Sequence, residues 1–313
     1  MVIDVEGLVK RYEEHVAVDH LNLEVEEGEI FGLLGPDGAG KSTTINCILS
    51  LIKYDKGFIK LFGRYMTENA YDLKARIGVV MQDLAIFREI TVYDNVDFFC
   101  GLYERKKKKR KELVEQALEF TGLTEFKKLY PTQLTTGILQ KLNIACGIAH
   151  RPELLILDEP LVGVDSENRV DILKMIKRLN QQGVTIFYVS HNVEDVEKVC
   201  KRIALMDDGK LIAEGTKEEL KAMINVRENI TIEILENSPE DFVSQLENLP
   251  NVHSAELEGN ILHVKSRKGK HNLSSLLYYF QEQKIAIGNV YSEEPTLGDV
   301  FLEMTGKELI NNG

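Results

Sequence analysis

The chain has 313 residues, of which 43% are hydrophobic, so it can build one large or two smaller globular domains. No segment contains the roughly eighteen uninterrupted apolar residues that a membrane-spanning helix needs, and the first residues resemble no signal peptide. A formal net charge of −12 argues against a protein that binds nucleic acid through a basic surface. We therefore expect a soluble protein that is not secreted.

In chain order, the apolar patterns of the first part predict a parallel sheet covered by helices. They predict a strand at 29–34, a glycine-rich turn at 35–42, a helix at 43–52, a strand at 153–158, a helix at 167–182 and a strand at 184–190. Strands that are apolar throughout and alternate with helices are buried on both faces. Residues 91–150 have an almost purely helical pattern, which predicts a helical lobe inserted into an α/β core.

The pattern changes after about residue 225. Strands at 229–236 and 285–293, helices at 239–249 and 272–283, and a hairpin over 251–266 give the order βαββαβ, which is typical of ferredoxin-like domains. A last amphipathic helix is expected at 296–306. We therefore expect two domains, 1–225 and 226–313.

Two other features limit the function. Four single cysteines, which lack the spacing of a metal site, indicate a reduced, cytoplasmic protein without zinc: Cys47, Cys100, Cys146 and Cys200. The basic run Arg105–Lys111 is interpreted first as a solvated connection between two helices, while contact with anionic headgroups or nucleic acid remains an alternative.

A phosphate-binding loop is predicted between the first buried strand and its helix. The segment matches the pattern G-x-x-x-x-G-K-S/T, and its residues are Gly35, Pro36, Asp37, Gly38, Ala39, Gly40, Lys41 and Ser42. Glycines allow successive backbone N–H groups to surround a phosphate, Lys41 can reach the β and γ oxygens, and the Ser42 hydroxyl can bind Mg²⁺. The sequence therefore predicts binding of a nucleoside triphosphate.

Two carboxylates follow the strand at 153–158. Asp158 is placed to hold the metal at the carboxyl end of the strand, where ligands of parallel sheets bind. Glu159, its neighbour with the opposite pleat direction, is placed to orient or deprotonate the attacking water.

The helix that begins near Thr135 opens with hydroxyl groups and glycine and has no acidic residue in its first turn. A helix start of this kind leaves its N–H groups and the positive end of its dipole available to an anion from outside.

Together these motifs resemble the ATP-binding subunit of an ABC transporter over residues 1 to about 220. The segment "GPDGAGKST" resembles the Walker A loop and adds Thr43 to the nucleotide contacts, and "LLILDEP" resembles Walker B. The resemblance implies a P-loop NTPase (RecA-like) core with antiparallel β and helical subdomains, ahead of the C-terminal ferredoxin-like α+β domain. It also implies Mg²⁺-dependent ATP hydrolysis.

The same resemblance assigns further residues. Tyr12 stands where the family stacks an aromatic ring on adenine, Gln82 is the Q-loop ligand of magnesium and water, and His191 is the switch histidine. Asp165 is the D-loop aspartate. The segment "LTTGI" stands in place of the signature LSGGQ, so Thr135 and Gly137 would contact the γ-phosphate of ATP bound to a second subunit.

The tail "EEPTLGDVFLEMTGKEL" resembles ATPase subunits of drug-resistance and antibiotic exporters. We therefore expect a peripheral ATPase on the cytoplasmic face of the cell membrane, which dimerises with ATP and drives a separate integral membrane permease, with no nucleic acid as partner. Two alternatives remain: a soluble ABC ATPase that acts on nucleic acid or ribosomes, and a regulatory nucleotide-binding module of low turnover, which the altered signature motivates.

Overall fold

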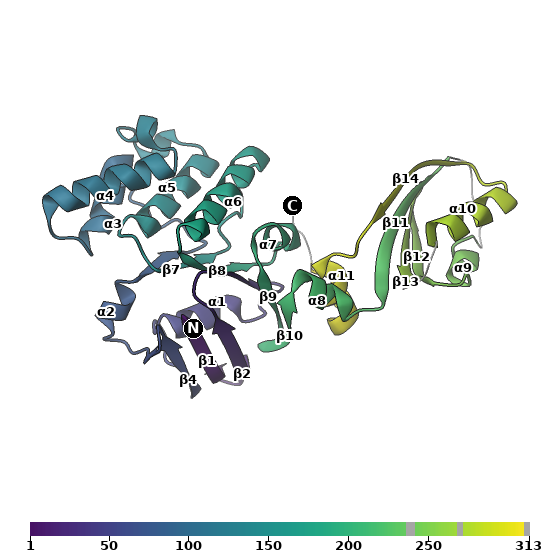
Figure 1. The fold of residues 1–313 in the computed structure, drawn as a ribbon, viewed down its shortest axis with the longest axis horizontal. Coiled ribbons are helices and arrows are strands. Elements are labelled where there is room, and N and C mark those ends of the chain that lie inside the picture. The colour runs from purple at the N-terminus through teal and green to yellow at the C-terminus, as the bar shows by residue number, and fades with distance from the viewer. Residues whose placement is uncertain (236–241, 268–271, 310–313) are drawn as a thin grey trace. The chain divides into compact units, whose positions relative to one another are not determined.

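The computed structural model describes residues 1–235, 242–267 and 272–309 (Figure 1). The chain forms two compact units, Met1–Thr216 and Lys217–Glu308. This division falls before the expected boundary at 225/226, because the short helix α8 (Lys217–Ala222) contacts α11 (Leu297–Thr305) of the second unit. Among the described residues, none of the helices has both the length and the apolar character required to cross a membrane.

The centre of the first unit is a six-stranded sheet in the order β10-β9-β3-β8-β7-β6. Its strands are β3 (Ile30–Leu34), β6 (Ile77–Val80), β7 (Leu154–Asp158), β8 (Thr185–Ser190), β9 (Arg202–Asp207) and β10 (Lys210–Thr216). All neighbours are parallel except β10, which pairs antiparallel with β9. Every residue of β3, β7 and β8 is buried, as expected for strands covered on both faces.

A second, antiparallel sheet of the first unit has the order β2-β1-β4-β5. It consists of β1 (Ile3–Tyr12), β2 (His15–Val25), β4 (Lys56–Leu61) and β5 (Arg64–Tyr65). Buried side chains of this sheet, of the helix α1 (Lys41–Ile48) and of the parallel strands form one apolar core. The two sheets therefore hold α1, and the loop before it, in a fixed position.

The segment expected to be a helical lobe contains α3 (Val92–Gly101), α4 (Lys107–Phe120) and α5 (Thr136–Ile148), with short 3-10 turns at Thr124–Phe126 and Pro131–Gln133 (Figure 1). The short helix α2 (Tyr71–Lys74) precedes β6, while α6 (Ser166–Gln181) and α7 (Val193–Val199) follow β7 and β8. The expected core, with antiparallel and helical parts, is confirmed.

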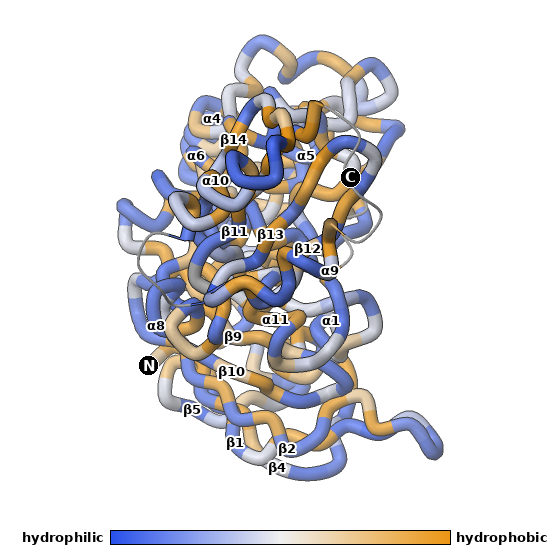
Figure 2. Tube along the Cα trace, turned by 90° about the vertical axis from the view of Figure 1, so that its right-hand side faces the viewer, coloured by the Kyte–Doolittle hydropathy of each residue, from blue (hydrophilic) through white to orange (hydrophobic). Residues whose placement is uncertain are grey.

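The second unit has the predicted βαββαβ order. Its elements are β11 (Val226–Ile234), α9 (Phe242–Glu247), β12 (Val252–Glu258), β13 (Ile261–Arg267), α10 (Asn272–Glu282) and β14 (Ile287–Glu293). The sheet order β12-β13-β11-β14 with antiparallel neighbours is that of a ferredoxin-like domain. Figure 2 shows hydrophobic and hydrophilic residues alternating along β11 and β13, as in a sheet with one buried face. Residues 236 and 239–241 of the predicted elements lie outside the described part.

Candidate active site

The glycine-rich loop joins β3 to α1 as predicted. Gly40 precedes α1 with φ of 103°, and Gly38 has φ of 82°, both in the left-handed region that glycine adopts without strain. A Cβ on Gly35 would lie 2.2 Å from the carbonyl oxygen of Met206, so only glycine fits there. The first turn of α1 has no acidic residue and no side-chain cap, which leaves its N–H groups available to a phosphate.

Lys41 is the first residue of α1 and is buried. Its Nζ donates hydrogen bonds to the carbonyl oxygens of Gly35 at 2.8 Å and Pro36 at 2.9 Å. The same atom lies 3.7 Å from Oε1 of Glu159. The buried ammonium group is therefore satisfied by the loop itself and is held where the loop meets the end of β7.

Asp158 ends β7 and faces the loop. The Ser42 hydroxyl donates to its Oδ2 at 3.1 Å, whereas its buried Oδ1 has no hydrogen-bond partner among the residues that the structure describes. Burial raises the pKa of Asp158, and the hydrogen bond from Ser42 opposes that rise. A hydroxyl group and an unpartnered carboxylate oxygen are ligands that Mg²⁺ prefers, so these two residues fit a magnesium ion.

Glu159 lies just beyond β7, with φ of 48°. Its side chain therefore diverges from that of Asp158 through a left-handed backbone turn, and not through the pleat of a continuing strand as the sequence analysis assumed. Its Oε2 accepts a hydrogen bond from the Ser190 hydroxyl at 3.1 Å, and its Oε1 lies 2.9 Å from Nδ1 of His191. The carboxylate is buried and held at both oxygens.

His191 follows the carboxyl end of β8 and is partly buried. Because a carboxylate only accepts hydrogen bonds, its contact with Glu159 requires the proton on Nδ1 and leaves Nε2 for a second partner. Oδ1 of the exposed Asp37 is 3.9 Å from the same Nδ1. Ser190, which sequence reasoning missed, carries a detectable signal: it is a hydroxyl residue at the end of a buried strand.

A cavity of about 270 Å³ brings eight of the predicted residues together with two others. Gln82, which follows β6, lines it together with Thr43, Lys41, Ser42 and Glu159. His15 and Ala17 of β2 also line it, and the sequence analysis did not include them. Their contribution depends on how the antiparallel sheet packs on the loop, which no local motif encodes.

Nine predicted residues do not line this cavity. Five of them belong to the loop or to the ends of β7 and β8: Gly35, Pro36, Ala39, Asp158 and His191. The other four lie elsewhere in the first unit. Tyr12 is 47% exposed at the end of β1, with Nζ of Lys10 4.8 Å from the centre of its ring. Thr135 precedes α5, and its side chain accepts no capping hydrogen bond. Gly137 is buried so close to Asn168 that a Cβ would lie 2.4 Å from the Asn168 side chain.

Asp165 lies at the start of α6, close to the first turn of α5. It accepts from the backbone N–H of Asn168 at 3.0 Å and from its side-chain amide at 2.9 Å. These hydrogen bonds lower the pKa of Asp165, led by the one from the backbone N–H. Asn168 therefore connects the D-loop aspartate to the first turn of α5.

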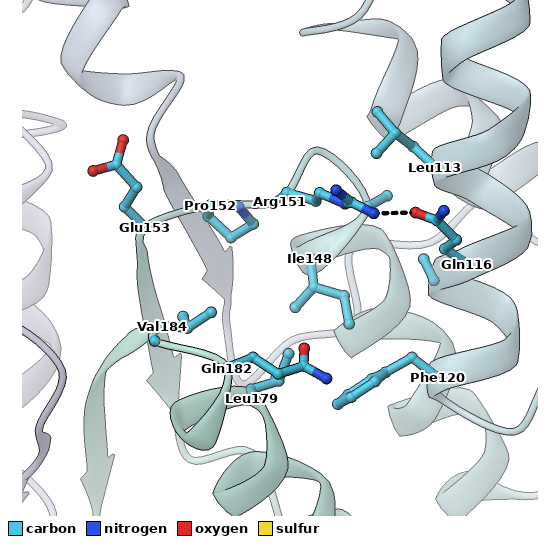
Figure 3. Close-up of a pocket in the computed structure, with 13 residues that line it drawn as sticks. Leu113, Gln116, Phe120, Ile148, Arg151, Pro152, Glu153, Leu179, Gln182 and Val184 are labelled. Atoms are coloured by element: carbon cyan, nitrogen blue, oxygen red, sulfur yellow. Dashed lines mark hydrogen bonds between the residues drawn. The ribbon is translucent and has the colours of Figure 1, made fainter.

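A larger cavity, of about 630 Å³, lies elsewhere in the first unit (Figure 3). Pro152 and Val184, which line it, precede β7 and β8, so this cavity lies at the amino ends of the strands. Arg151 reaches across it to hydrogen-bond Gln116, while Glu153 points away (Figure 3). Because parallel sheets bind their ligands at the carboxyl ends, the smaller cavity is the candidate active site.

Comparisons with known proteins agree with this geometry. Residues 18–162 match the ABC transporter family, and residues 215–305 match the C-terminal domain of DrrA1-3-like ATP-binding proteins. The linearmycin resistance ATP-binding protein LnrL of Bacillus subtilis (strain 168) is 33% identical over 98% of this chain and 99% of its own. The daunorubicin resistance ATP-binding protein DrrA3 of Streptomyces coeruleorubidus is 30% identical over 98% of this chain and 96% of its own.

A solved dimer of the ATP-binding cassette MJ0796, in a post-hydrolysis state with ADP and Pi, is 27% identical with a TM-score of 0.63, covering 68% of this chain and 98% of that one. The chain belongs to the ATP-binding proteins of ABC transporters, of the drug-resistance and antibiotic-export type. It is an ATP-binding and ATP-hydrolysing transport subunit, a class whose members work with membrane permeases and dimerise. The alternative of a nucleic-acid or ribosome ATPase is not favoured.

Proposed function

We propose that the cavity at the carboxyl ends of the parallel strands, which Lys41, Ser42 and Glu159 line, binds the phosphates of ATP with Mg²⁺ and is the site where the terminal phosphate is hydrolysed. The backbone of the loop and Lys41 bind the phosphates, and Ser42, Asp158 and Gln82 hold the magnesium ion, which supplies charge neutralisation. Glu159 orients or deprotonates the attacking water, and His191 contacts the γ-phosphate through its Nε2. Tyr12 provides a ring for adenine.

One observation carries this assignment. Lys41 of α1, Glu159 just beyond β7 and His191 just beyond β8 meet within hydrogen-bond or ion-pair distance. Asp158, at the end of β7, is joined to α1 by its hydrogen bond from Ser42. Of these, Lys41, Asp158 and Glu159 are buried charged side chains. A fold retains such a group only where its members satisfy one another or act on a ligand.

We further propose that two copies complete each other's sites. Thr135, Gly137 and Asp165 lie away from the cavity of their own chain, on the exposed or closely packed starts of α5 and α6. The uncapped N-terminus of α5 supplies hydrogen-bond donors to a γ-phosphate held by the other copy. ATP then acts as the link between the two subunits.

The dimer drives a separate integral membrane permease from the cytoplasmic face of the membrane, and the direction of transport is export. The relatives named for linearmycin and daunorubicin resistance support a drug or antibiotic as the exported compound. The test is affinity purification of the tagged chain from detergent-solubilised membranes, followed by identification of the bound integral protein. Reconstitution of the pair should give ATP-dependent efflux, and a chain that recovers no integral protein would refute the coupling.

A further inference from the structure

The connection between α3 and α4 has a charge opposite to that of the whole chain. Seven consecutive basic residues, Arg105–Lys111, occur in a chain with a net charge of −12. All of them are exposed except Arg110, which is partly buried. We call the segment Leu102–Lys111 the basic connection.

Only two of these cations are paired within the described part of the chain. Lys109 forms an ion pair with Glu104 at 2.8 Å, and Arg110 forms one with Asp97 of α3 at 2.8 Å. The first pair joins the start of α4 to the connection before it, and the second joins it to α3. No described residue pairs with the remaining cations, Arg105, Lys106, Lys107, Lys108 and Lys111. Their charges are therefore available to an external anion.

The start of α4 is also unfavourable for a helix that serves stability alone. Lys106 occupies the N-cap position without a side-chain cap, and no acidic residue lies in the first turn. Lys107 and Lys108 instead place positive charges at the positive end of the helix dipole. A local sequence that contradicts the rules of helix capping indicates a function outside the helix.

Apolar side chains accompany the cations. Leu102 is 60% exposed and Tyr103 is 45% exposed, and only Glu104 separates them from the basic run. Lysine and arginine beside exposed aliphatic and aromatic side chains are typical of surfaces that lie on a membrane. One face of Tyr103 already stacks on His150 at 4.0 Å, so that ring is a poor platform for nucleic-acid bases.

We propose that the basic connection binds the anionic lipid headgroups of the membrane surface. This contact is additional to the permease interface of the proposed function, and it requires no nucleotide. It attracts the subunit to the membrane before it finds its permease, because headgroup attraction acts over about a Debye length, roughly 8 Å at physiological ionic strength.

The test is flotation of the purified full chain with vesicles, without permease or nucleotide. The chain should float with vesicles that contain phosphatidylglycerol, but not with vesicles of phosphatidylcholine alone, and added salt should release it. The variant Lys106→Gln/Lys107→Gln/Lys108→Gln should lower partitioning by roughly 100-fold, since each lysine near an anionic surface contributes about fivefold. Arginine at the same three positions should preserve binding.

A matched control removes the same charge elsewhere. Lys174, Lys177 and Lys201 are exposed lysines of the first unit, and their triple glutamine variant should float like the wild type. ATP binding measured in lipid-free buffer should be equal in all variants, so a failure of the lipid contact is distinct from a failure of the nucleotide site. Equal flotation with both vesicle types, or full binding by the Lys106–Lys108 variant, would overturn the proposal. So would tighter, lysine-dependent binding to duplex DNA or RNA.

Discussion

The hydroxyl group of Ser190 donates a hydrogen bond to Oε2 of Glu159 at 3.1 Å, while its oxygen accepts one from the backbone N–H of Asn192 at 3.0 Å. Because Glu159 lies on a left-handed turn beyond β7, its orientation depends on this hydroxyl group and on His191. Ser190 is therefore a positioning residue for the carboxylate that acts on water.

Ser190→Ala should slow ATP turnover. A hydrogen bond to a charged group contributes about 1.5–3 kcal/mol, which corresponds to roughly 10- to 100-fold in kcat when the bond persists in the transition state. The KM for ATP should change little, since Ser190 does not line the cavity that is proposed to bind the phosphates. Ser190→Thr keeps the hydroxyl group and should restore most of the rate. Steady-state kinetics of both variants would check this, and a normal kcat for Ser190→Ala would remove the positioning role.

Glu159→Gln should bind ATP and hydrolyse it on the order of 10²–10⁴-fold more slowly, because the water loses its positioned base. Because the ATP between the two subunits stays unhydrolysed, the variant should accumulate as an ATP-dependent dimer. Gel filtration with and without ATP measures this, with Glu167→Gln on α6 as an exposed carboxylate control. Unchanged turnover would exclude Glu159 as the catalytic carboxylate.

Lys41→Ala should abolish measurable ATP binding in calorimetry while the fold persists. The ammonium group contacts the carbonyl oxygens of Gly35 and Pro36 and the carboxylate of Glu159. After its removal, the buried carboxylate still has Ser190 and His191 as partners, so the fold should tolerate the change. Circular dichroism provides the folding control. Retained affinity in a folded variant would contradict the assignment of the phosphate loop.

Gly137→Ala should destabilise the start of α5 by about 1–3 kcal/mol, the usual cost of overpacking. The added methyl group would lie 2.4 Å from Cγ of Asn168 and would displace the side chain that binds Asp165. Hydrogen exchange at the first turn of α5 reports the loss. In the double variant with Asn168→Gly, the two effects should be clearly less than additive, and full additivity would show that the contact is unimportant.

Asp299 should stabilise the second unit above pH 4. Burial acts to raise the pKa of this carboxyl group, but hydrogen bonds from Lys265, Thr296 and Asn229 outweigh burial and lower it. A folded pKa below the unfolded value of about 3.9 means that the stabilisation is present above that pH and is lost as the pH falls through the folded pKa.

Asp299→Asn should therefore cost about 1–3 kcal/mol at pH 7, since it weakens the capping box of α11 and the pair with Lys265. Hydrogen exchange in α11 of the full chain is the measurement. The exposed Glu258→Gln is the control, and unchanged protection of α11 in Asp299→Asn would contradict the prediction.

Much of the site could be predicted because its chemistry is local in sequence. The loop from Gly35 to Ser42 follows one buried strand, and the pair Asp158 and Glu159 stands at the end of another. The carboxyl ends of parallel strands meet at one edge of the sheet. The ferredoxin-like order followed from alternating patterns and from the turn at Gly259. These features depend on backbone conformation and on periodicity, which a single sequence encodes.

Other features depend on packing between distant segments. The contact of Gly137 with Asn168 joins helices separated by the whole of β7, and His15 enters the cavity only because the antiparallel sheet packs beside the loop. The start of the second unit at Lys217 depends on the contact between α8 and α11, which lie at its two ends. The local sequence around these residues carries no signal from which these contacts could have been predicted.

The two carbonyl acceptors of Lys41 mean that nucleotide binding is an exchange and not a simple gain. A phosphate must replace the oxygens of Gly35 and Pro36 around the ammonium group, so the lysine contributes only the difference between the old and new bonds. A lone orthophosphate offers few further contacts to offset that rearrangement, whereas a polyphosphate chain also engages the N–H groups of the loop. Orthophosphate should therefore compete only weakly with ATP for the loop, which favours its release after each hydrolysis cycle.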